Sequence, residues 1–123
     1  MEKMKVPSAA LVLALDAART IRDVEKAALQ ALHEGNDEAS YRAGMLEKCR
    51  LLSGLPEAVS DFLMDADGPE AEAFATGLED FARKAAQAMS LNSVFYMSAL
   101  LYPEEYADGD PNDLEAFLAR FTE

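Results

Sequence analysis

The sequence predicts an all-α protein, with residues 1–123 forming a single helical-bundle domain. Apolar residues recur at helical spacing along nearly the whole chain, and no segment shows convincing strand alternation. Alanine is the commonest residue and tryptophan is absent, which favours helices packed at close range. The connections between helices are short. We therefore expect an irregular antiparallel bundle of about five to six helices, two of them long.

The first helix is expected to begin near Ser8 and to end before Gly35. Its first half is apolar on most sides, because Val12, Leu13 and Leu15 lie off the main apolar stripe. A helix of this kind is either central in its bundle or shared with another subunit. We therefore expect a homodimer formed through the first helix as one arrangement of the chain. The main stripe consists of Leu11, Ala14, Ala18, Ile21, Val24, Ala28 and Leu32.

Two further helices follow before residue 68. Asn36 or Asp37 can cap the second helix, which is expected to end at Gly54. Pro56 then opens a short helix that stops at Gly68. The capped helix has one apolar face, which consists of Tyr41, Met45, Cys49 and Leu52.

Pro69 stands at the first position of another long helix, with Glu70 and Glu72 in its first turn, where the helix dipole favours acidic side chains. The apolar phase slips after Met89, which predicts a break and a restarted helix. The restarted helix is expected to reach Tyr102, because Pro103 follows it.

The last helix is predicted to begin with Asp110 as its cap, followed by Pro111. Its apolar face consists of Leu114, Phe117, Leu118 and Phe121. This face predicts that the helix packs on the bundle core.

The net charge of −12 is carried by one part of the chain. Residues 1–50 contain eight acidic and eight basic residues, whereas residues 51–123 contain fifteen acidic and three basic residues. No basic stripe is available to neutralise phosphates, so binding to DNA or RNA is not expected. The one-sided acidity predicts a basic protein partner or serves solubility.

The chain is expected to be cytoplasmic. Cys49 is the only cysteine, so it cannot form an internal disulfide, and its place on an apolar helix face predicts a buried structural thiol. No stretch approaches the ~20 apolar residues that a membrane span needs, so no membrane partner is expected.

We predict no catalytic residue, no cofactor and no metal site. The only histidine, His33, has no partner at a spacing suited to base catalysis or metal binding. Asp108, Asp110 and Asn112 reproduce the start of a calcium loop. That loop needs glycine at its sixth position and glutamate at its twelfth, but Asp113 and Ala119 occupy these positions here. The chain is therefore not expected to be an enzyme.

The segment from Val94 to Asp113 is the candidate binding surface. It combines an apolar helix, three tyrosines and a run of carboxylates. Tyrosines offer a large contact area with a polar tip, and carboxylates steer a basic partner. The candidate partner-binding residues are Tyr96, Tyr102, Glu104, Glu105, Tyr106 and Asp108.

Within this segment the sequence LLYPEEY, Leu100–Tyr106, resembles a turn of helical redox-enzyme maturation chaperones, in which apolar helix residues run into a proline and two acidic residues. The resemblance covers seven residues, and the second motif of that family has no counterpart in its proper place. It assigns no family, and it implies only that a chaperone is one variant of a binding protein.

The expected function is therefore binding of another protein, as an adaptor or chaperone-like module without catalysis. An acidic nucleic-acid mimic that inhibits a DNA-binding protein is one alternative. A second is a protein that binds divalent metal weakly through the carboxylates of residues 104–113. Chaperoning predicts an apolar groove, whereas mimicry predicts carboxylates spread at phosphate-like spacing over one face.

Overall fold

A computed structural model describes residues 6–122, and within that range the ordered elements are all helices, which confirms the all-α class. The elements are α1 (Ser8–Gly35), α2 (Glu38–Leu63), α3 (Pro69–Ser90), α4 (Val94–Ala99) and α5 (Asp113–Ala119). Three helices are long, with 28, 26 and 22 residues, where two were expected. No helix in the described range is both long and apolar enough to cross a bilayer.

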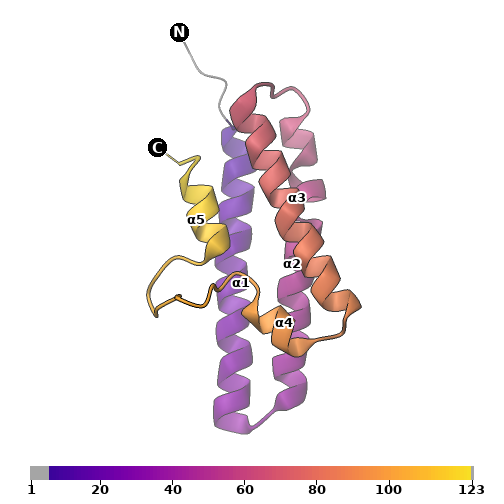
Figure 1. Ribbon diagram of the computed structural model, residues 1–123, viewed down its shortest axis with the longest axis vertical. Coiled ribbons are helices and arrows are strands. Elements are labelled where there is room, and N and C mark those ends of the chain that lie inside the picture. The colour runs from indigo at the N-terminus through magenta and orange to yellow at the C-terminus, as the bar shows by residue number, and fades with distance from the viewer. Residues whose placement is uncertain (1–5, 123) are drawn as a thin grey trace.

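Helices α1 and α2 form a long antiparallel hairpin, and the later elements lie against it (Figure 1). Helix α3 packs along α2, α4 crosses the hairpin near its middle, and α5 lies beside the first half of α1. The hairpin extends beyond α4, toward the turn that joins α1 to α2. We call this the distal half of the hairpin, residues 22–50.

The starts of three helices agree with the sequence. Helix α1 begins at Ser8 and α3 at Pro69, and the Asp37 carboxylate caps α2 by accepting from Ser40 N–H at 3.0 Å. The predicted break after Met89 is also confirmed. Asn92 has φ 53°, and the Ser93 side chain caps α4 by accepting from Tyr96 N–H.

Helix α2 does not end at Gly54, which corrects the expectation of a separate helix opened by Pro56. It continues through Pro56 to Leu63. A proline inside a helix removes one backbone hydrogen bond and crowds the preceding turn. The buried side chains of Leu52, Leu55 and Val59 keep helical spacing across the proline, so packing of one face holds the helix together.

The last two helices are shorter than expected. Helix α4 ends at Ala99 rather than Tyr102, because Leu100 is extended and Leu101 has φ 82°. Helix α5 begins at Asp113 and is capped by Asn112 rather than by Asp110. The Asp110 carboxylate instead accepts from Ala107 N–H at 3.2 Å within the preceding loop. The chain between α4 and α5, residues 100–112, is called the strap below.

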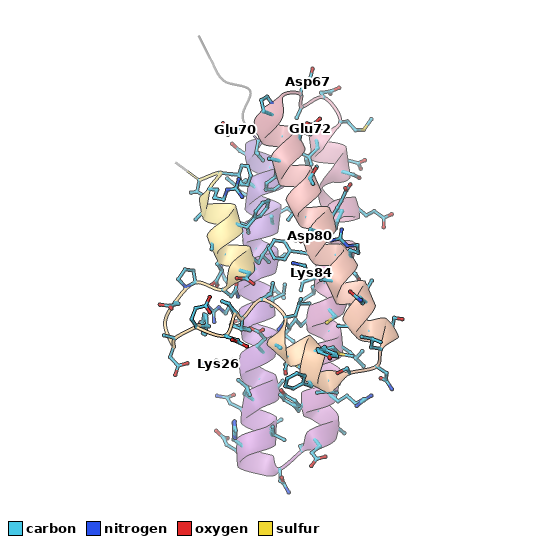
Figure 2. The ribbon with its side chains drawn as sticks, in the orientation of Figure 1. Lys26, Asp67, Glu70, Glu72, Asp80 and Lys84 are labelled. Carbon is cyan, nitrogen blue, oxygen red and sulfur yellow. The ribbon has the colours of Figure 1, made fainter. Side chains whose placement is uncertain are left out.

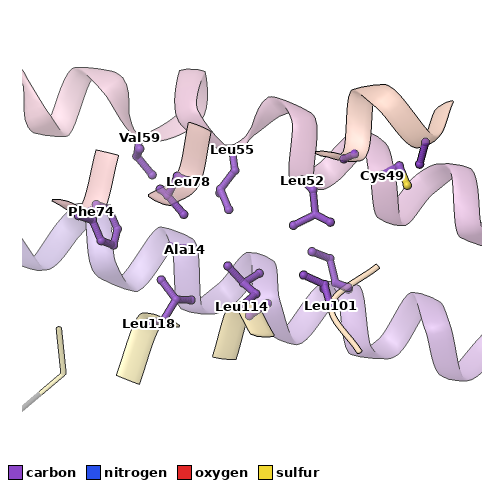
Figure 3. Packing of buried hydrophobic residues seen from close by; sticks show 14 of the residues in the cluster. Ala14, Cys49, Leu52, Leu55, Val59, Phe74, Leu78, Leu101, Leu114 and Leu118 are labelled. Carbon is purple, nitrogen blue, oxygen red and sulfur yellow. The ribbon is translucent and has the colours of Figure 1, made fainter. Parts of the chain in front are cut away.

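Side chains from all five helices meet in one hydrophobic core (Figure 3). Phe74 and Leu78 of α3 lie opposite Ala14 of α1, and Leu114 and Leu118 of α5 close the core beside α1. Cys49 is fully buried, as its place on an apolar face predicted, and burial raises the pKa of its thiol. The core also explains the apolar first half of α1, since Leu11, Leu13 and Leu15 pack against it.

Gly44 and Gly54 of α2 are a matched pair for testing how closely α1 and α2 pack. A Cβ on Gly44 would lie 2.7 Å from the Ala28 Cβ, whereas one on Gly54 would meet nothing within 4 Å. We expect Gly44→Val to lower the free energy of unfolding by about 1–3 kcal/mol through overpacking. Gly54→Ala should raise it by about 0.5–1 kcal/mol through helix propensity. Urea unfolding followed by circular dichroism measures both, and equal effects of the two substitutions would contradict this account.

Candidate functional site

A buried ion pair joins α1 to α2 at the centre of the molecule. Glu25 is 7% exposed and Lys48 is fully buried, and the Lys48 Nζ lies 2.9 Å from the Glu25 Oε2. Charged side chains are rarely buried to this extent unless they are paired. The pair therefore marks the place in the fold where polar contacts replace apolar packing.

The ammonium of Lys48 also holds the beginning of the strap. It donates to the backbone oxygens of Leu100 at 2.7 Å and Ser98 at 3.3 Å. These two carbonyl oxygens and the ion-paired Glu25 carboxylate together surround the ammonium. A side chain of α2 thus satisfies the Ser98 and Leu100 carbonyls, which a further turn of α4 would otherwise have to satisfy. The helix can therefore stop at Ala99.

Tyr102 closes this cluster from the strap. Its hydroxyl donates to the Glu25 carboxylate, and its ring lies 5.0 Å from the Lys48 Nζ in a cation–π contact. Burial, followed by the hydrogen bond to Glu25, raises the pKa of Tyr102 above its usual range. Burial lowers the pKa of Lys48, against the attraction of Glu25, which favours the charged form.

Arg22, one turn before Glu25 on α1, holds the rest of the strap. Its guanidinium makes two hydrogen bonds to the Glu115 carboxylate, at 2.7 and 2.9 Å, and donates to the Tyr106 hydroxyl at 3.2 Å and the Asp110 carbonyl at 3.0 Å. The hydrogen bonds from Arg22 hold the pKa of Glu115 below its usual value. One arginine therefore ties α1 to both the strap and α5.

A reciprocal cap fixes the start of α5 next to Arg22. The Asn112 side chain accepts from Glu115 N–H, and the Glu115 carboxylate accepts from Asn112 N–H, both at 2.9 Å. The Glu115 carboxylate therefore accepts hydrogen bonds both from Asn112 N–H in the cap and from the Arg22 guanidinium. Asp113 N–H also donates to the Leu101 carbonyl at 2.8 Å, which joins the two ends of the strap.

An open groove lies beside this cluster on the distal half of the hairpin. Its volume is about 690 Å³. Leu29, Tyr41, Met45 and Tyr102 supply apolar surface, and the buried Glu25 also belongs to its lining. A second hollow of about 610 Å³ shares Tyr41 with it and reaches Leu32 and Val94. The two hollows, which have Tyr41 in common, are together called the distal groove below.

The structure separates the six candidate partner-binding residues into two groups. Tyr102 and Tyr106 are half-buried, and their hydroxyls bond within the chain. Tyr96 is exposed on α4, and Glu104, Glu105 and Asp108 are exposed on the strap. Tyr102 lines the distal groove, whereas Tyr96 lines a different hollow between α3 and α4.

The carboxylates of residues 104–113 do not converge. Within the described residues no group of three His, Cys, Asp or Glu side chains is placed to hold a metal ion. Asp110 accepts a backbone N–H of the strap, and Asn112 caps α5. These contacts explain the Asp110 and Asn112 positions of the Asp-x-Asp-x-Asn pattern through local backbone geometry.

Sequence reasoning missed the residues at the centre of this site, Arg22, Glu25 and Lys48. A signal for two of them exists. Glu25 lies four residues after Ile21 and three before Ala28, and Lys48 lies three after Met45 and four before Leu52, so each charge falls on a buried stripe. Opposite charges on the apolar faces of two adjacent antiparallel helices indicate a buried pair. Arg22 lies beside the stripe and gives no comparable signal.

The chain matches no protein-family model, no curated protein and no solved structure. The functional argument therefore rests on the geometry of the site.

Proposed function

We propose that this protein is a non-catalytic adaptor or chaperone-like module that binds a basic amphipathic helix of a partner protein in the distal groove. The observation that carries the proposal is an apolar groove along an uncovered helix seam, bordered by exposed carboxylates. Helix-in-groove binding uses the same packing that joins helices within a bundle. Elsewhere along the hairpin, α3, α4 and α5 supply that packing.

The dimensions of the groove suit a short helix. Its lining on α1 runs from Arg22 to Glu34, which corresponds to roughly 18 Å at ~1.5 Å per residue. Leu29 is 44% exposed at its centre, and the buried Met45 and half-buried Tyr41 lie across from it on α2. A helix of about 12 residues would cover these side chains with one apolar stripe.

The charges around the groove favour a basic occupant. The lining of its two hollows holds four carboxylates, Asp23, Glu25, Glu34 and Glu38, and three cations, Arg22, Lys26 and Arg42. Glu25 and Arg22 are paired within the chain, which leaves three carboxylates against two cations. The strap, whose Tyr102 lines the groove, carries the exposed carboxylates of Glu104, Glu105 and Asp108. Such a surface accelerates the approach of a cationic segment and disfavours an acidic one, and salt weakens both effects.

The cluster beneath the groove supports binding rather than catalysis. Lys48 is fully buried, and its ammonium is held by the Ser98 and Leu100 carbonyls and by the Glu25 carboxylate, so the amine is not presented to a substrate. Its role in this proposal is to hold Tyr102 and the strap as one wall of the groove. Asp67, Glu70 and Glu72 lie at the other end of the molecule from the distal groove, so a nucleic-acid mimic would use a different surface from the one proposed here (Figure 2).

A defined peptide tests the proposal. We expect a synthetic amphipathic helix of leucine and lysine to shift the backbone amide resonances of residues 22–45 in ¹⁵N-labelled protein. Leu29→Glu should weaken this binding by about tenfold or more, since it places a charge in the apolar floor, while added salt also weakens it. The matched control is Val12→Glu, because Val12 is a similarly exposed apolar residue of α1 outside the groove.

Two results would contradict the proposal. One is equally tight binding of a peptide in which glutamate replaces lysine. This would show that the bordering carboxylates do not favour a basic peptide over an acidic one. The other is a set of shifted resonances that excludes residues 22–45. In cells, the partner should be a protein that is lost from affinity purification with Leu29→Glu and retained with Val12→Glu.

A further inference from the structure

A second exposed surface lies where α3 meets α4, beside a hollow that shares no lining residue with the distal groove. Leu91, Phe95 and Tyr96 are 58%, 73% and 56% exposed, although all three are large and apolar. The rings of Phe95 and Tyr96 pack edge to face, with their centroids 5.5 Å apart. We call these three residues the aromatic corner. Clustered exposed aromatic side chains mark interaction surfaces, whereas single ones are common on any protein.

The aromatic corner combines a protrusion with a hollow. A groove of about 410 Å³ lies beside it, lined largely by Ala88, Leu91, Ala99 and Leu100. Tyr96 forms part of this lining, while Phe95 stands outside it. A surface that carries both a projecting ring and an apolar hollow can pair with a copy of itself about a twofold axis, with each ring entering the other hollow.

The distribution of charge indicates that the aromatic corner binds a second copy of this chain. No Asp, Glu, Lys or Arg occurs between Lys84 and Glu104, which is the longest uncharged stretch in a chain of net charge −12. Two copies of so acidic a protein repel each other, so they can approach only where carboxylates are few. Asp80 is the carboxylate nearest this stretch on α3, and Lys84 and Arg83 pair with it. Arg42 adds a positive charge by donating to Asn92 at 2.6 Å.

We infer that the aromatic corner is the contact between two copies of this chain in a twofold-symmetric dimer. A basic partner would meet Lys84 in the hollow of the aromatic corner, where no carboxylate belongs to the lining. This inference places the dimer contact on the aromatic corner, whereas the sequence predicted a contact through the first helix. Most of the apolar side chains of α1 are covered within the chain, and Val12 is the large apolar residue exposed in its first half.

Sedimentation equilibrium of the full chain tests this inference. We expect the apparent mass to rise from the 13.4 kDa of one chain toward twice that value between micromolar and millimolar protein. Phe95→Asp should raise the dissociation constant by about 30-fold or more, since it removes a central ring and adds a repelling charge on both copies. Because Phe95 is exposed, the variant should keep the circular dichroism spectrum of the original protein. Added salt should preserve or strengthen the dimer by screening the repulsion between copies.

Val12→Asp is the matched control and should leave the dissociation constant unchanged. A single-chain mass for the original protein at millimolar concentration would overturn the inference. So would a dimer that survives Phe95→Asp, and one lost with Val12→Asp alone would place the contact on α1 instead.

Discussion

Replacing Lys48 by alanine is expected to lower the free energy of unfolding by about 3–5 kcal/mol, the range found when one member of a buried ion pair is removed. The substitution leaves the Glu25 carboxylate buried without its cation. It also leaves the Ser98 and Leu100 carbonyls without the donor that now satisfies them. A loss of this size is a large fraction of the stability of a domain of this length. Urea unfolding followed by circular dichroism measures it.

The double variant Glu25→Leu, Lys48→Met separates loss of pairing from loss of packing. Apolar replacement of a whole buried pair is often nearly neutral, so the double variant should be more stable than the sum of the two single effects predicts. Lys26→Ala is the control, because Lys26 is an exposed lysine one residue from Glu25 (Figure 2). If Lys48→Ala cost no more than Lys26→Ala, Lys48 would not hold the strap as we describe.

The predictable part of this fold is the part governed by local chemistry and helical periodicity. The start of α1, the Asp37 cap, Pro69 at the first position of α3 and the restart at Ser93 each depend on a few neighbouring residues. The burial of Cys49 followed from its place on one face of a helix. Such features need no knowledge of which helices meet.

The errors occurred where tertiary contacts override local rules. Pro56 is a strong local stop signal, yet the buried face of α2 continues across it. Asp110 and Pro111 are a plausible helix start, but the reciprocal cap of Asn112 and Glu115 sets the start of α5. Glu115 is held there by Arg22, which lies 93 residues earlier in the chain. No local pattern contains that contact.

The strap shows the same limit at the candidate site. Tyr102 and Tyr106 belong to a segment whose composition suggested an exposed docking edge, but their hydroxyls are engaged by Glu25, Arg22 and the strap backbone. Leu101 has φ 82°, a conformation that costs a residue with a side chain about 1–2 kcal/mol. It is only 3% exposed, so burial of its side chain and the contacts of Lys48 with the Leu100 carbonyl before it and the Tyr102 ring after it support that conformation.

Arg22→Ala is expected to release the strap and the start of α5 from α1, and to lower the free energy of unfolding by about 1.5–3 kcal/mol. Arg22 has several acceptors, but this expected loss of stability is the size of one charged hydrogen bond. The side chain of Arg22 is 35% exposed, so water replaces some of the bonds that the substitution removes. Arg22→Lys should recover less than half of the loss, since an ammonium cannot bond both Glu115 oxygens as the guanidinium does. Amide exchange of residues 100–113 should accelerate in both variants.

The pH dependence of this effect has a definite sign. The pKa of Glu115 lies below its usual 4.5 because Arg22 bonds to the carboxylate and Asn112 N–H also donates to it. A carboxyl group whose pKa is lower in the folded protein than in the unfolded chain binds fewer protons there, so its contribution is complete above the unfolded pKa and is lost on acidification through the folded one. The stability difference between the original protein and Arg22→Ala should therefore be constant near neutral pH and should shrink below about 4.5. A difference that stayed constant into that acidic range would show that Arg22 stabilises the fold by packing rather than through its charge pair with Glu115.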